Sequence, residues 1–285
     1  MRTLQDAVAV VTGAGSGIGR ALALELARGG ASLALADVDE TGLAETQAAI
    51  GDRVKIMTRR VDVSKPDEMA AFREAVEAEF GRCSLLVNNA GVALYGRFED
   101  VSQDDLAWIM GINFWGAVYG CREFLPLLRR EPAANVVTIS SVFGLIAPPL
   151  QSGYCASKFA VRGFSEVLRH ELAYSNVRVT VVHPGGIKTK IAANTRRGAR
   201  ADEASWKRDT KGFERSLVTP PAVAATKIVH AVLHDRPRLL IGNDAFLIDM
   251  VQRFWAAQYA KILAPVLDPK GNLAALLARN PEHEP

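Results

Sequence analysis

The sequence predicts an α/β fold, a doubly wound and mostly parallel sheet of the Rossmann type, with about seven strands and with helices on both faces. Short apolar runs alternate with segments of helical periodicity along the chain, which favours parallel strands joined by helices. A glycine-rich turn stands between the first apolar run and the first helical segment. The 285 residues are 49% hydrophobic, so we expect one domain with a large core over residues 1–285.

The first strand and the first helix flank the glycine turn. Residues 7–11 are apolar and rich in valine, as in a buried parallel strand, and residues 18–28 have the spacing of an amphipathic helix. Glycines let the backbone turn tightly and approach a ligand, while the start of a helix offers free N–H groups and a partial positive charge to phosphates. The residues expected to hold a dinucleotide here are Gly13, Ser16, Gly17, Ile18 and Gly19. The turn alone leaves a connection without a ligand as the alternative.

The second strand, expected over residues 32–36, is followed by a carboxylate. Asp37 stands 18 residues after the last glycine of the turn, close to the offset of ~20 at which a carboxylate binds the hydroxyls of the adenosine ribose. It would repel a 2′-phosphate, and no Arg or Lys follows at Val38 or Asp39, which favours NAD over NADP. The alternative is a helix cap, because Asp37 and Asp39 both precede a helix expected to begin near Glu40.

A tyrosine and a lysine form the candidate proton-transfer pair. Tyr154 and Lys158 are four residues apart at the start of a helix expected over residues 154–174, so they share one face. An ammonium ~4 Å from the phenolate is worth roughly 4 kcal/mol at a dielectric near 20, which would bring the pKa of the phenol from about 10 to near 7. An exposed aromatic–lysine pair is the alternative. Ser141 favours the functional interpretation, because it follows an apolar strand expected over residues 135–140 and precedes the tyrosine by thirteen residues.

Together these motifs resemble the short-chain dehydrogenase/reductase family, in its short, single-domain type. The matching motifs run in order along residues 7–189: Thr12-Gly13-x-x-x-Gly17-Ile18-Gly19, Asp62-Val63, Asn88-Asn89-Ala90-Gly91, Asn113, Ile139-Ser140-Ser141, Tyr154-x-x-x-Lys158, and Pro184-Gly185 with Thr189. The resemblance implies a sheet in the order 3-2-1-4-5-6-7, with the site at the C-terminal ends of the strands where this order reverses.

The resemblance also implies an active-site tetrad of Asn113, Ser141, Tyr154 and Lys158. Tyr154 would exchange a proton with the substrate oxygen, and Ser141 would orient the reacting group. Lys158 would lower the pKa of the phenol and hold the nicotinamide ribose, and Asn113 would hold a water. From the residues alone, Asn113 could instead be a structural break in a helix around residues 108–118.

Further cofactor contacts follow from the same resemblance. Asp62, followed by Val63, would meet the adenine edge, and Asn89 would meet the adenosine ribose. Ile187 and Thr189 would bind near the nicotinamide carboxamide and the phosphates. A buried hydrogen-bond clamp between strands is the alternative for Asn88 and Asn89. His183, at the end of a strand expected over residues 177–182, is interpreted as a structural residue.

The expected activity is that of an NAD-dependent oxidoreductase that transfers a hydride between nicotinamide and a secondary alcohol or ketone. The alternative is an NAD-binding regulator or scaffold, and the complete tetrad favours the enzyme. The residues expected around the substrate make the pocket apolar: Tyr95, Phe98, Phe143, Leu145, Ile146, Pro148, Pro149 and Leu150.

Two segments depart from a minimal member of the family. Residues 190–217 are polar and basic and are expected to form the substrate lid. The C-terminal extension over residues 245–285 contains an amphipathic stretch, 246–267, too interrupted by charges to span a membrane. It is expected to cover the pocket, to pack on a neighbouring subunit or to rest on a membrane surface, in that order of preference.

Composition limits the partners. The net charge of +3 indicates no nucleic-acid partner, and no Cys/His spacing indicates a metal site. Three widely spaced cysteines without a signal peptide suggest reduced thiols in the cytoplasm. The resemblance implies a homodimer or homotetramer that pairs helices expected near residues 102–130 and 154–174. Their apolar positions for such pairing are Trp108, Trp115, Phe124, Phe164 and Leu168.

Overall fold

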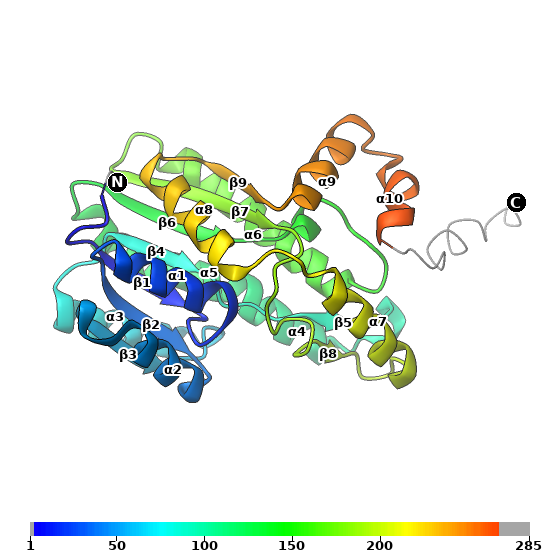
Figure 1. The fold of residues 1–285 in the computed structure, drawn as a ribbon, viewed down its shortest axis with the longest axis horizontal. Coiled ribbons are helices and arrows are strands. Elements are labelled where there is room, and N and C mark those ends of the chain that lie inside the picture. The colour runs from blue at the N-terminus through cyan, green and yellow to red at the C-terminus, as the bar shows by residue number, and fades with distance from the viewer. Residues whose placement is uncertain (1–2, 268–285) are drawn as a thin grey trace, which may run out of the picture.

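The computed structural model describes residues 3–267, and a seven-stranded parallel sheet lies at its centre (Figure 1). Its strands are β1 (Val8–Thr12), β2 (Ser32–Asp37), β3 (Ile56–Arg60), β4 (Leu85–Asn88), β6 (Ala134–Ile139), β7 (Val177–Pro184) and β9 (Arg238–Ile241). They lie in the order β3-β2-β1-β4-β6-β7-β9. Counted along the chain, this is the order 3-2-1-4-5-6-7, so the predicted topology is confirmed.

Two short strands lie outside this sheet. β5 (Leu94–Tyr95) pairs in parallel with β8 (Arg196–Arg197), and they form a separate two-stranded sheet. The sequence analysis did not predict this pair. It joins the connection after β4 to the segment expected to be the lid.

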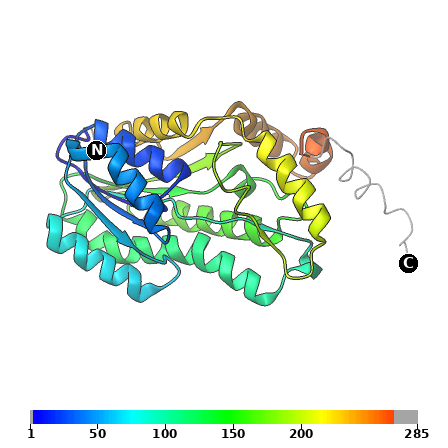
Figure 2. The same cartoon turned by 60° about the horizontal axis from the view of Figure 1, so that its bottom comes forward.

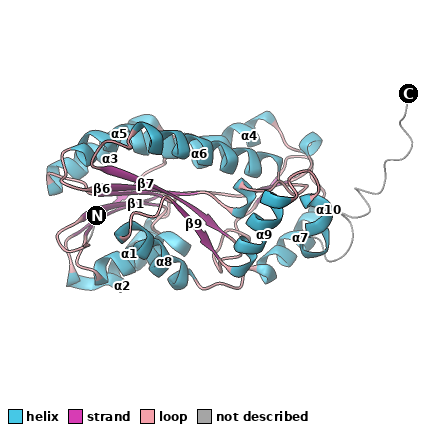
Figure 3. Cartoon of the chain, turned by 90° about the horizontal axis from the view of Figure 1, so that it is seen from above, coloured by secondary structure: helices cyan, strands magenta, loops and turns pink. Residues whose placement is uncertain are grey.

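Helices cover both faces of the main sheet, as predicted (Figures 2 and 3). One layer contains α1 (Gly17–Arg28), α2 (Glu40–Ile50) and α8 (Pro221–Leu233). The other contains α3 (Pro66–Phe80), α4 (Gln103–Met110), α5 (Gly116–Arg129) and α6 (Ser152–Glu171). Because both faces are covered, the central strands β1, β4 and β6 are buried along their whole length. The edge strand β3 is less buried and ends in Arg59 and Arg60.

Each helix layer encloses its own core. Leu22 and Leu26 of α1 pack with the apolar face of α8 on one side of the sheet. On the other side, Phe72 and Phe124 meet edge to face, with their ring centroids 5.7 Å apart. The three cysteines, Cys83, Cys121 and Cys155, are free and buried.

Burial changes the interpretation of two positions that were expected to pair subunits. Phe124 is fully buried and Leu168 is 8% exposed, and both belong to the core of this chain. The expectation that they face a partner is therefore wrong. Trp115 and the α6 residues Phe159 and Val167 are exposed instead.

A π-helical turn, Gly111–Trp115, joins α4 to α5. It contains Asn113, so the structural break considered for this residue is present. A π turn makes room for one extra residue, and such turns often stand at functional sites.

Three helices gather at one end of the molecule (Figure 3): α7 (Glu203–Ser216), α9 (Asn243–Phe254) and α10 (Tyr259–Leu267). The expected lid, 190–217, thus contains β8 and α7. Residues 268–285 of the expected C-terminal extension lie outside the described residues. Within residues 3–267, no helix has the length and apolar character needed to cross a membrane.

The C-terminal helices pack on the loop that follows β6. Ala245, Ile248 and Leu263 form one apolar cluster with Val142 and Ile146 of that loop. Tyr259 Oη also accepts a hydrogen bond from the backbone N–H of Ala147 at 3.1 Å. The C-terminal part of the chain therefore supports the loop that begins after β6.

Asp249 attaches α9 to β9. Its carboxylate, 8% exposed, accepts hydrogen bonds from Arg238 of β9 and from Arg253 one helical turn further on. Burial raises the pKa of Asp249, but the bonds from the two arginines outweigh burial and hold the pKa below its usual range.

We expect Asp249→Ala to lower the free energy of unfolding by about 2 kcal/mol, because hydrogen bonds between charged groups are lost and Arg238 is left without its partner. Urea denaturation measures the change. Glu203→Ala is the matched control, since its pair with Lys207 is more than half exposed on both sides and is worth under ~1 kcal/mol. Equal effects of the two substitutions would contradict the structural role of Asp249.

Candidate active site

The site residues predicted from the sequence come together at the C-terminal edge of the sheet. The glycine turn follows β1, and the ends of two strands on one side of it and of three strands on the other carry the other candidates. Their positions are Asp37 at the end of β2, Asp62 after β3, Asn88 at the end of β4, Ser141 after β6, and Ile187 with Thr189 after β7. The strand order reverses between β1 and β4, which is where ligands bind in sheets of this kind.

Two glycines explain why the turn is shaped as it is. Gly13 has a φ of +67°, and a side chain there would also lie 2.8 Å from Ala90 Cα. A Cβ on Gly19 would lie 2.1 Å from the carbonyl oxygen of Gly13. Only glycine at both positions lets α1 begin this close to the end of β1.

The N-terminus of α1 has no side-chain cap within the described chain. Ser16 occupies the N-cap position, but its side chain makes no capping hydrogen bond. By contrast, Asp39 caps α2 by accepting from the N–H of Gly42 at 2.9 Å. The first amides of α1 are therefore available to an anionic group. A groove of about 570 Å³ adjoins this end of the helix, where Ser16 and Gly17 face Thr189.

Asp37 points at the glycine turn. Its Oδ2 accepts from the N–H of Gly15 at 2.8 Å, and its Oδ1 accepts from the N–H of Asp39 at 3.0 Å. Because Asp39 provides the helix cap, the cap interpretation applies to Asp39 and not to Asp37. Each carboxylate oxygen can accept a further hydrogen bond, so Asp37 can still bind hydroxyl groups.

Arg20 of α1 lies beside the glycine turn and binds three acceptors of the protein. Its guanidinium donates to the carbonyl oxygens of Gly15 and Gly42 and pairs with Glu45 at 2.7 Å. These bonds tie α1 to α2. All three bonds use Nη2, and the buried Nε has no hydrogen-bond partner among the described residues.

Asn89 acts as the clamp that the sequence analysis considered as an alternative. Its Nδ2 donates to the carbonyl oxygens of Thr12 at 2.9 Å and Gly13 at 3.0 Å. Its backbone N–H donates to Thr12 Oγ1 at 3.1 Å. Asn88 donates from Nδ2 to Cys121 Sγ at 3.3 Å. The ribose contact predicted for Asn89 would therefore use Oδ1, since its amide nitrogen holds the glycine turn.

Hydrogen bonds or burial fix the positions of three further cofactor candidates. Asp62 Oδ1 accepts from the N–H and the hydroxyl of Ser64, at 3.0 and 2.7 Å. Val63 is buried, and its Cγ2 would lie 2.7 Å from a side chain on Gly116. Ile187 is also buried, with 4% exposure. The backbone at Val63 and Ile187 is therefore positioned by buried side chains.

The four residues of the expected tetrad lie close together. Ser141 is hydrogen-bonded to Tyr154 and also accepts from the N–H of Phe143 at 3.1 Å. Lys158 Nζ lies 5.8 Å from the centroid of the Tyr154 ring. A Cβ on Gly91 would lie 3.3 Å from both Lys158 Nζ and Asn113 Oδ1. Gly91 thus marks the place where the lysine and the asparagine approach each other.

Asn113 is held by three hydrogen bonds. Its Oδ1 accepts from the N–H of Val92 at 2.8 Å, and its Nδ2 donates to Val92 O and to Ser157 Oγ, both at 3.0 Å. It joins the π turn to the segment after β4 and to α6. In this structure Asn113 fixes the backbone beside Lys158.

The pKa expected for Tyr154 is wrong for this structure. Burial raises the pKa of Tyr154 to about 12, although the hydrogen bond with Ser141 lowers it in part. Burial lowers the pKa of Lys158 to about 8. The sequence argument counted the charge of the ammonium and left out burial. The lysine also donates to the carbonyl oxygen of Ile139 at 3.0 Å, so the phenol is not its partner here.

His183 supports the backbone at Ser141, which agrees with its interpretation as a structural residue and adds a specific contact. The imidazole is fully buried, and its Nδ1 lies 3.2 Å from the carbonyl oxygen of Ser141. Because a carbonyl can only accept, Nδ1 must carry the proton. Nε2 has no hydrogen-bond partner within the described residues. The available signal was the position of His183 at the end of a strand beside the one that precedes Ser141.

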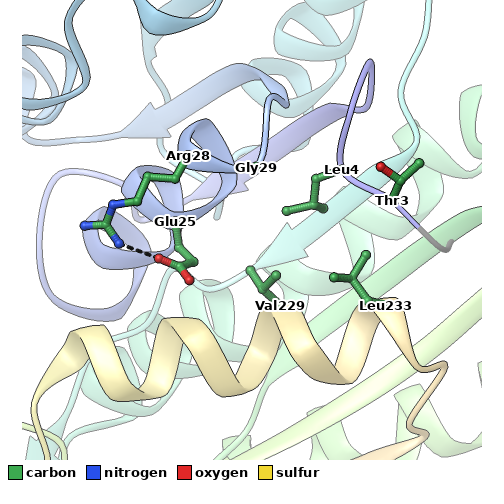
Figure 4. Close-up of a pocket in the computed structure, with 7 residues that line it drawn as sticks. All are labelled: Thr3, Leu4, Glu25, Arg28, Gly29, Val229 and Leu233. Carbon is green, nitrogen blue, oxygen red and sulfur yellow. Dashed lines mark hydrogen bonds and ion pairs between the residues drawn. The ribbon is translucent and has the colours of Figure 1, made fainter.

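A second groove lies away from these residues. It has a volume of about 430 Å³ and is lined by Leu4, Val229, Leu233 and the paired side chains of Glu25 and Arg28 (Figure 4). It adjoins the C-terminal end of α1, so the length of that 12-residue helix, roughly 16 Å, separates it from the glycine turn. This groove shares no residue with the candidate site.

Comparison with known proteins identifies the family of the chain. The family model described as short chain dehydrogenase matches residues 7–200. A Mycobacterium tuberculosis protein named as an oxidoreductase, SadH, is 42% identical over 270 residues, which cover 93% of this chain and 96% of that protein.

Solved structures show the same similarity. A short-chain dehydrogenase/reductase from Burkholderia phymatum, in complex with NAD, has a TM-score of 0.82 and 33% identity and covers 89% of this chain and 95% of that one. Levodione reductase has a TM-score of 0.76 and 26% identity, with 86% and 98% covered.

The buried His183 predicts a dependence of stability on pH. Burial lowers its pKa from 6.5 to about 4. The unfolded chain therefore binds a proton before the folded chain does, and stability is lost as the pH falls from about 6.5 to about 4. The loss from this residue amounts to about 3 kcal/mol.

Urea denaturation between pH 7 and pH 4 measures this loss, and His183→Asn is the comparison, because an amide can donate to Ser141 without titrating. We expect the free energy of unfolding to fall with decreasing pH more steeply in the wild type than in the variant. Parallel pH curves would contradict a buried, neutral His183.

Proposed function

The chain belongs to the short-chain dehydrogenase/reductase family, and we propose that it is an NAD-dependent enzyme that transfers a hydride between nicotinamide and a secondary alcohol or ketone. As a member of this family it is an oxidoreductase. The observation that carries the finer proposal is the meeting of Ser141, Tyr154, Lys158 and Asn113 beside a glycine turn whose helix has no side-chain cap.

The residues around the glycine turn fit the dinucleotide. The chain's own atoms pack closely against Gly13 and Gly19, which keeps the turn tight, and the first amides of α1 are available for the pyrophosphate. We assign the remaining contacts to residues at the strand ends, namely Ser16, Gly17, Ile18, Asp37, Asp62, Val63, Asn89, Ile187 and Thr189. When bound, the nicotinamide gives or accepts the hydride.

In this proposal, Tyr154 is the acid in ketone reduction and the base in alcohol oxidation. Since burial raises its pKa, the phenol is protonated near neutral pH and can donate its proton to the carbonyl oxygen of a ketone. Ser141 donates a hydrogen bond to the same oxygen and fixes its orientation. Its hydroxyl already accepts from the N–H of Phe143, so its proton is directed away from that amide.

Lys158 and Asn113 support this proton transfer. The lysine is 4% exposed with a pKa of about 8, so its charge is available near neutral pH beside the phenolate that forms. We assign to Asn113 the role of holding a water beside Lys158. Its side chain binds the backbone of Val92, which adjoins Gly91, and Asn113 and Lys158 approach each other at Gly91. Such a water would connect the lysine with solvent.

The arrangement of charges around β2 supports NAD rather than NADP. Asp37 faces the glycine turn, and a 2′-phosphate in its vicinity would be repelled. Nη2 of the nearby Arg20 is bonded to Gly15, Gly42 and Glu45. The structure from Burkholderia phymatum was solved with NAD.

We also propose that the chain forms a homodimer or homotetramer. Three large apolar side chains that the chain itself leaves exposed lie on the π turn and α6: Trp115, Phe159 and Val167. Pairing of this surface across a two-fold axis would remove them from water.

Tyr154→Phe tests the acid–base assignment. We expect turnover to fall at least ~100-fold, because the substitution removes the proton donor, while the affinity for NAD changes little. NADH formation on a panel of secondary alcohols at alkaline pH measures turnover, and NADH fluorescence measures binding. Tyr174→Phe is the control, because Tyr174 lies in the turn after α6 and is fully exposed. Near wild-type turnover of Tyr154→Phe would refute the assignment.

Substitutions at Asp37 test the cofactor assignment. We expect the wild type to prefer NAD over NADP by at least ~tenfold in kcat/KM, which corresponds to about 1.4 kcal/mol. Asp37→Asn should lower the preference for NAD, while its amide oxygen can still accept from the N–H of Gly15. Asp37→Asn with Val38→Arg should reverse the ratio, since a guanidinium can pair with the phosphate.

Steady-state kinetics with both cofactors measure the ratio, and Val38→Ala alone is the control for the exposed neighbouring position. A wild-type enzyme that uses the two cofactors equally would show that Asp37 only braces the glycine turn.

A further inference from the structure

The lid helix α7 is held over the site by few contacts. No residue of α7 is buried by the part of the chain that the structure describes. Two of its side chains nevertheless reach the side of the molecule on which Tyr154 lies. These are Asp209 and Phe213, which are four residues apart and therefore share one face of the helix.

The polar contact joins Asp209 to Tyr95. Tyr95 Oη donates to Asp209 Oδ2 at 2.7 Å, and the tyrosine is 7% exposed. Burial raises the pKa of Tyr95, so the phenol keeps the proton that it donates. Tyr95 belongs to β5, which also pairs with β8 at the start of the lid. The same short strand thus holds the lid at two places.

The base of the lid is fixed separately. Arg196 of β8 pairs with Asp105 at 3.4 Å and lies over the ring of Trp108 at 4.5 Å. Asp105 also accepts from the N–H of Ala199 at 3.2 Å. Since the base is anchored to α4, loss of the Asp209 contact would release α7 without releasing the whole segment.

The apolar contact continues inward as a series of rings. Phe213, 36% exposed, stacks on Phe143 with a centroid distance of 6.5 Å and an interplanar angle of 27°. Phe143 meets the Tyr154 ring edge to face at 6.2 Å and 86°. Tyr154 itself is 8% exposed. Aromatic faces therefore extend from the surface at Phe213 to the phenol.

We propose that Phe143 and Phe213 select substrates that carry a flat, uncharged ring beside the reacting carbon, and that the Tyr95–Asp209 bond holds α7 closed over that ring. This inference rests on the proposed function, because it places the substrate oxygen at the Tyr154 phenol. The group next to the reacting carbon then lies among these rings. Stacked and edge-on contacts favour another aromatic ring over a puckered ring of the same size, and a charged group would lose its water without a partner there.

Other residues that were expected to line the pocket contribute differently. Phe98 is 72% exposed, and Ile146 is fully buried in the cluster with α9. Of that set, Phe143 connects the Tyr154 ring with Phe213 of the lid, and Tyr95 binds the lid through Asp209.

Two ketones with the same carbon skeleton test the selection. Acetophenone has a flat ring and cyclohexyl methyl ketone has a puckered one. With saturating NADH, we expect the wild type to favour acetophenone by about tenfold in kcat/KM, and Phe213→Ala to reduce this preference to about threefold or less, chiefly through KM. Lys211→Ala, an exposed change on the same helix, should leave the preference unchanged.

The outcomes separate the two proposals. Equal kcat/KM for the two ketones in the wild type, or no turnover of either, would overturn the ring selection. If the wild type still oxidises secondary alcohols, the proposed function survives that result. If it forms no NADH on any alcohol of the panel, the proposed function fails as well.

Hydrogen–deuterium exchange tests the closure without any turnover. In the presence of NADH, we expect Tyr95→Phe to speed exchange of the α7 amides about tenfold, while exchange in α8 stays unchanged. Phe213→Ala should act in the same direction. Unchanged exchange of α7 in Tyr95→Phe would overturn the role of the Tyr95–Asp209 bond, whatever the kinetics show.

Discussion

The hydrogen bonds between the ends of β1 and β4 are the constraint on which both halves of the site depend. Asn89 holds the carbonyl oxygens of Thr12 and Gly13, and Thr12 Oγ1 accepts from the backbone amides of Asn89 and Ala90. On one side of this clamp the glycine turn leads into α1. On the other side the chain continues to Gly91, against which Lys158 and Asn113 pack. The seat proposed for the cofactor and the proposed proton path are therefore positioned by the same few bonds.

Burial and charge act against each other at the centre of the site. The protein interior disfavours the charged forms of both Tyr154 and Lys158, which raises the pKa of the phenol and lowers that of the amine. The two pKa values therefore move apart, from 10.0 to about 12 for Tyr154 and from 10.5 to about 8 for Lys158. Burial favours the neutral form of each group when the other is left out of account. A phenolate that forms at Tyr154 would therefore depend on the charge of the nearby ammonium for its stability.

The sequence was sufficient for the parts of the structure that depend on local patterns. Apolar runs located β1, β2, β6 and β7 of the main sheet, and the spacing of glycines identified the first turn. The choice between Asp37 and Asp39 as helix cap required coordinates, because both stand before α2 and only the direction of the side chains separates them. Phe124 and Leu168 were misjudged because an apolar residue looks the same in a sequence whether it faces a core or a partner. The β5–β8 pair was missed because each strand has two residues and about a hundred residues separate them.

The contact between the C-terminal helices and the loop after β6 has a consequence for how the protein is made. Val142 and Ile146 find their apolar partners in Ala245, Ile248 and Leu263, roughly a hundred residues later in the chain. During synthesis the strands up to β7 can emerge from the ribosome and pair while those partners are still untranslated. The segment that follows Ser141 therefore completes its packing only after α9 and α10 have left the exit tunnel. A nascent chain stalled before this point would carry all four residues of the proposed tetrad, but the loop that follows Ser141 would lack its apolar support.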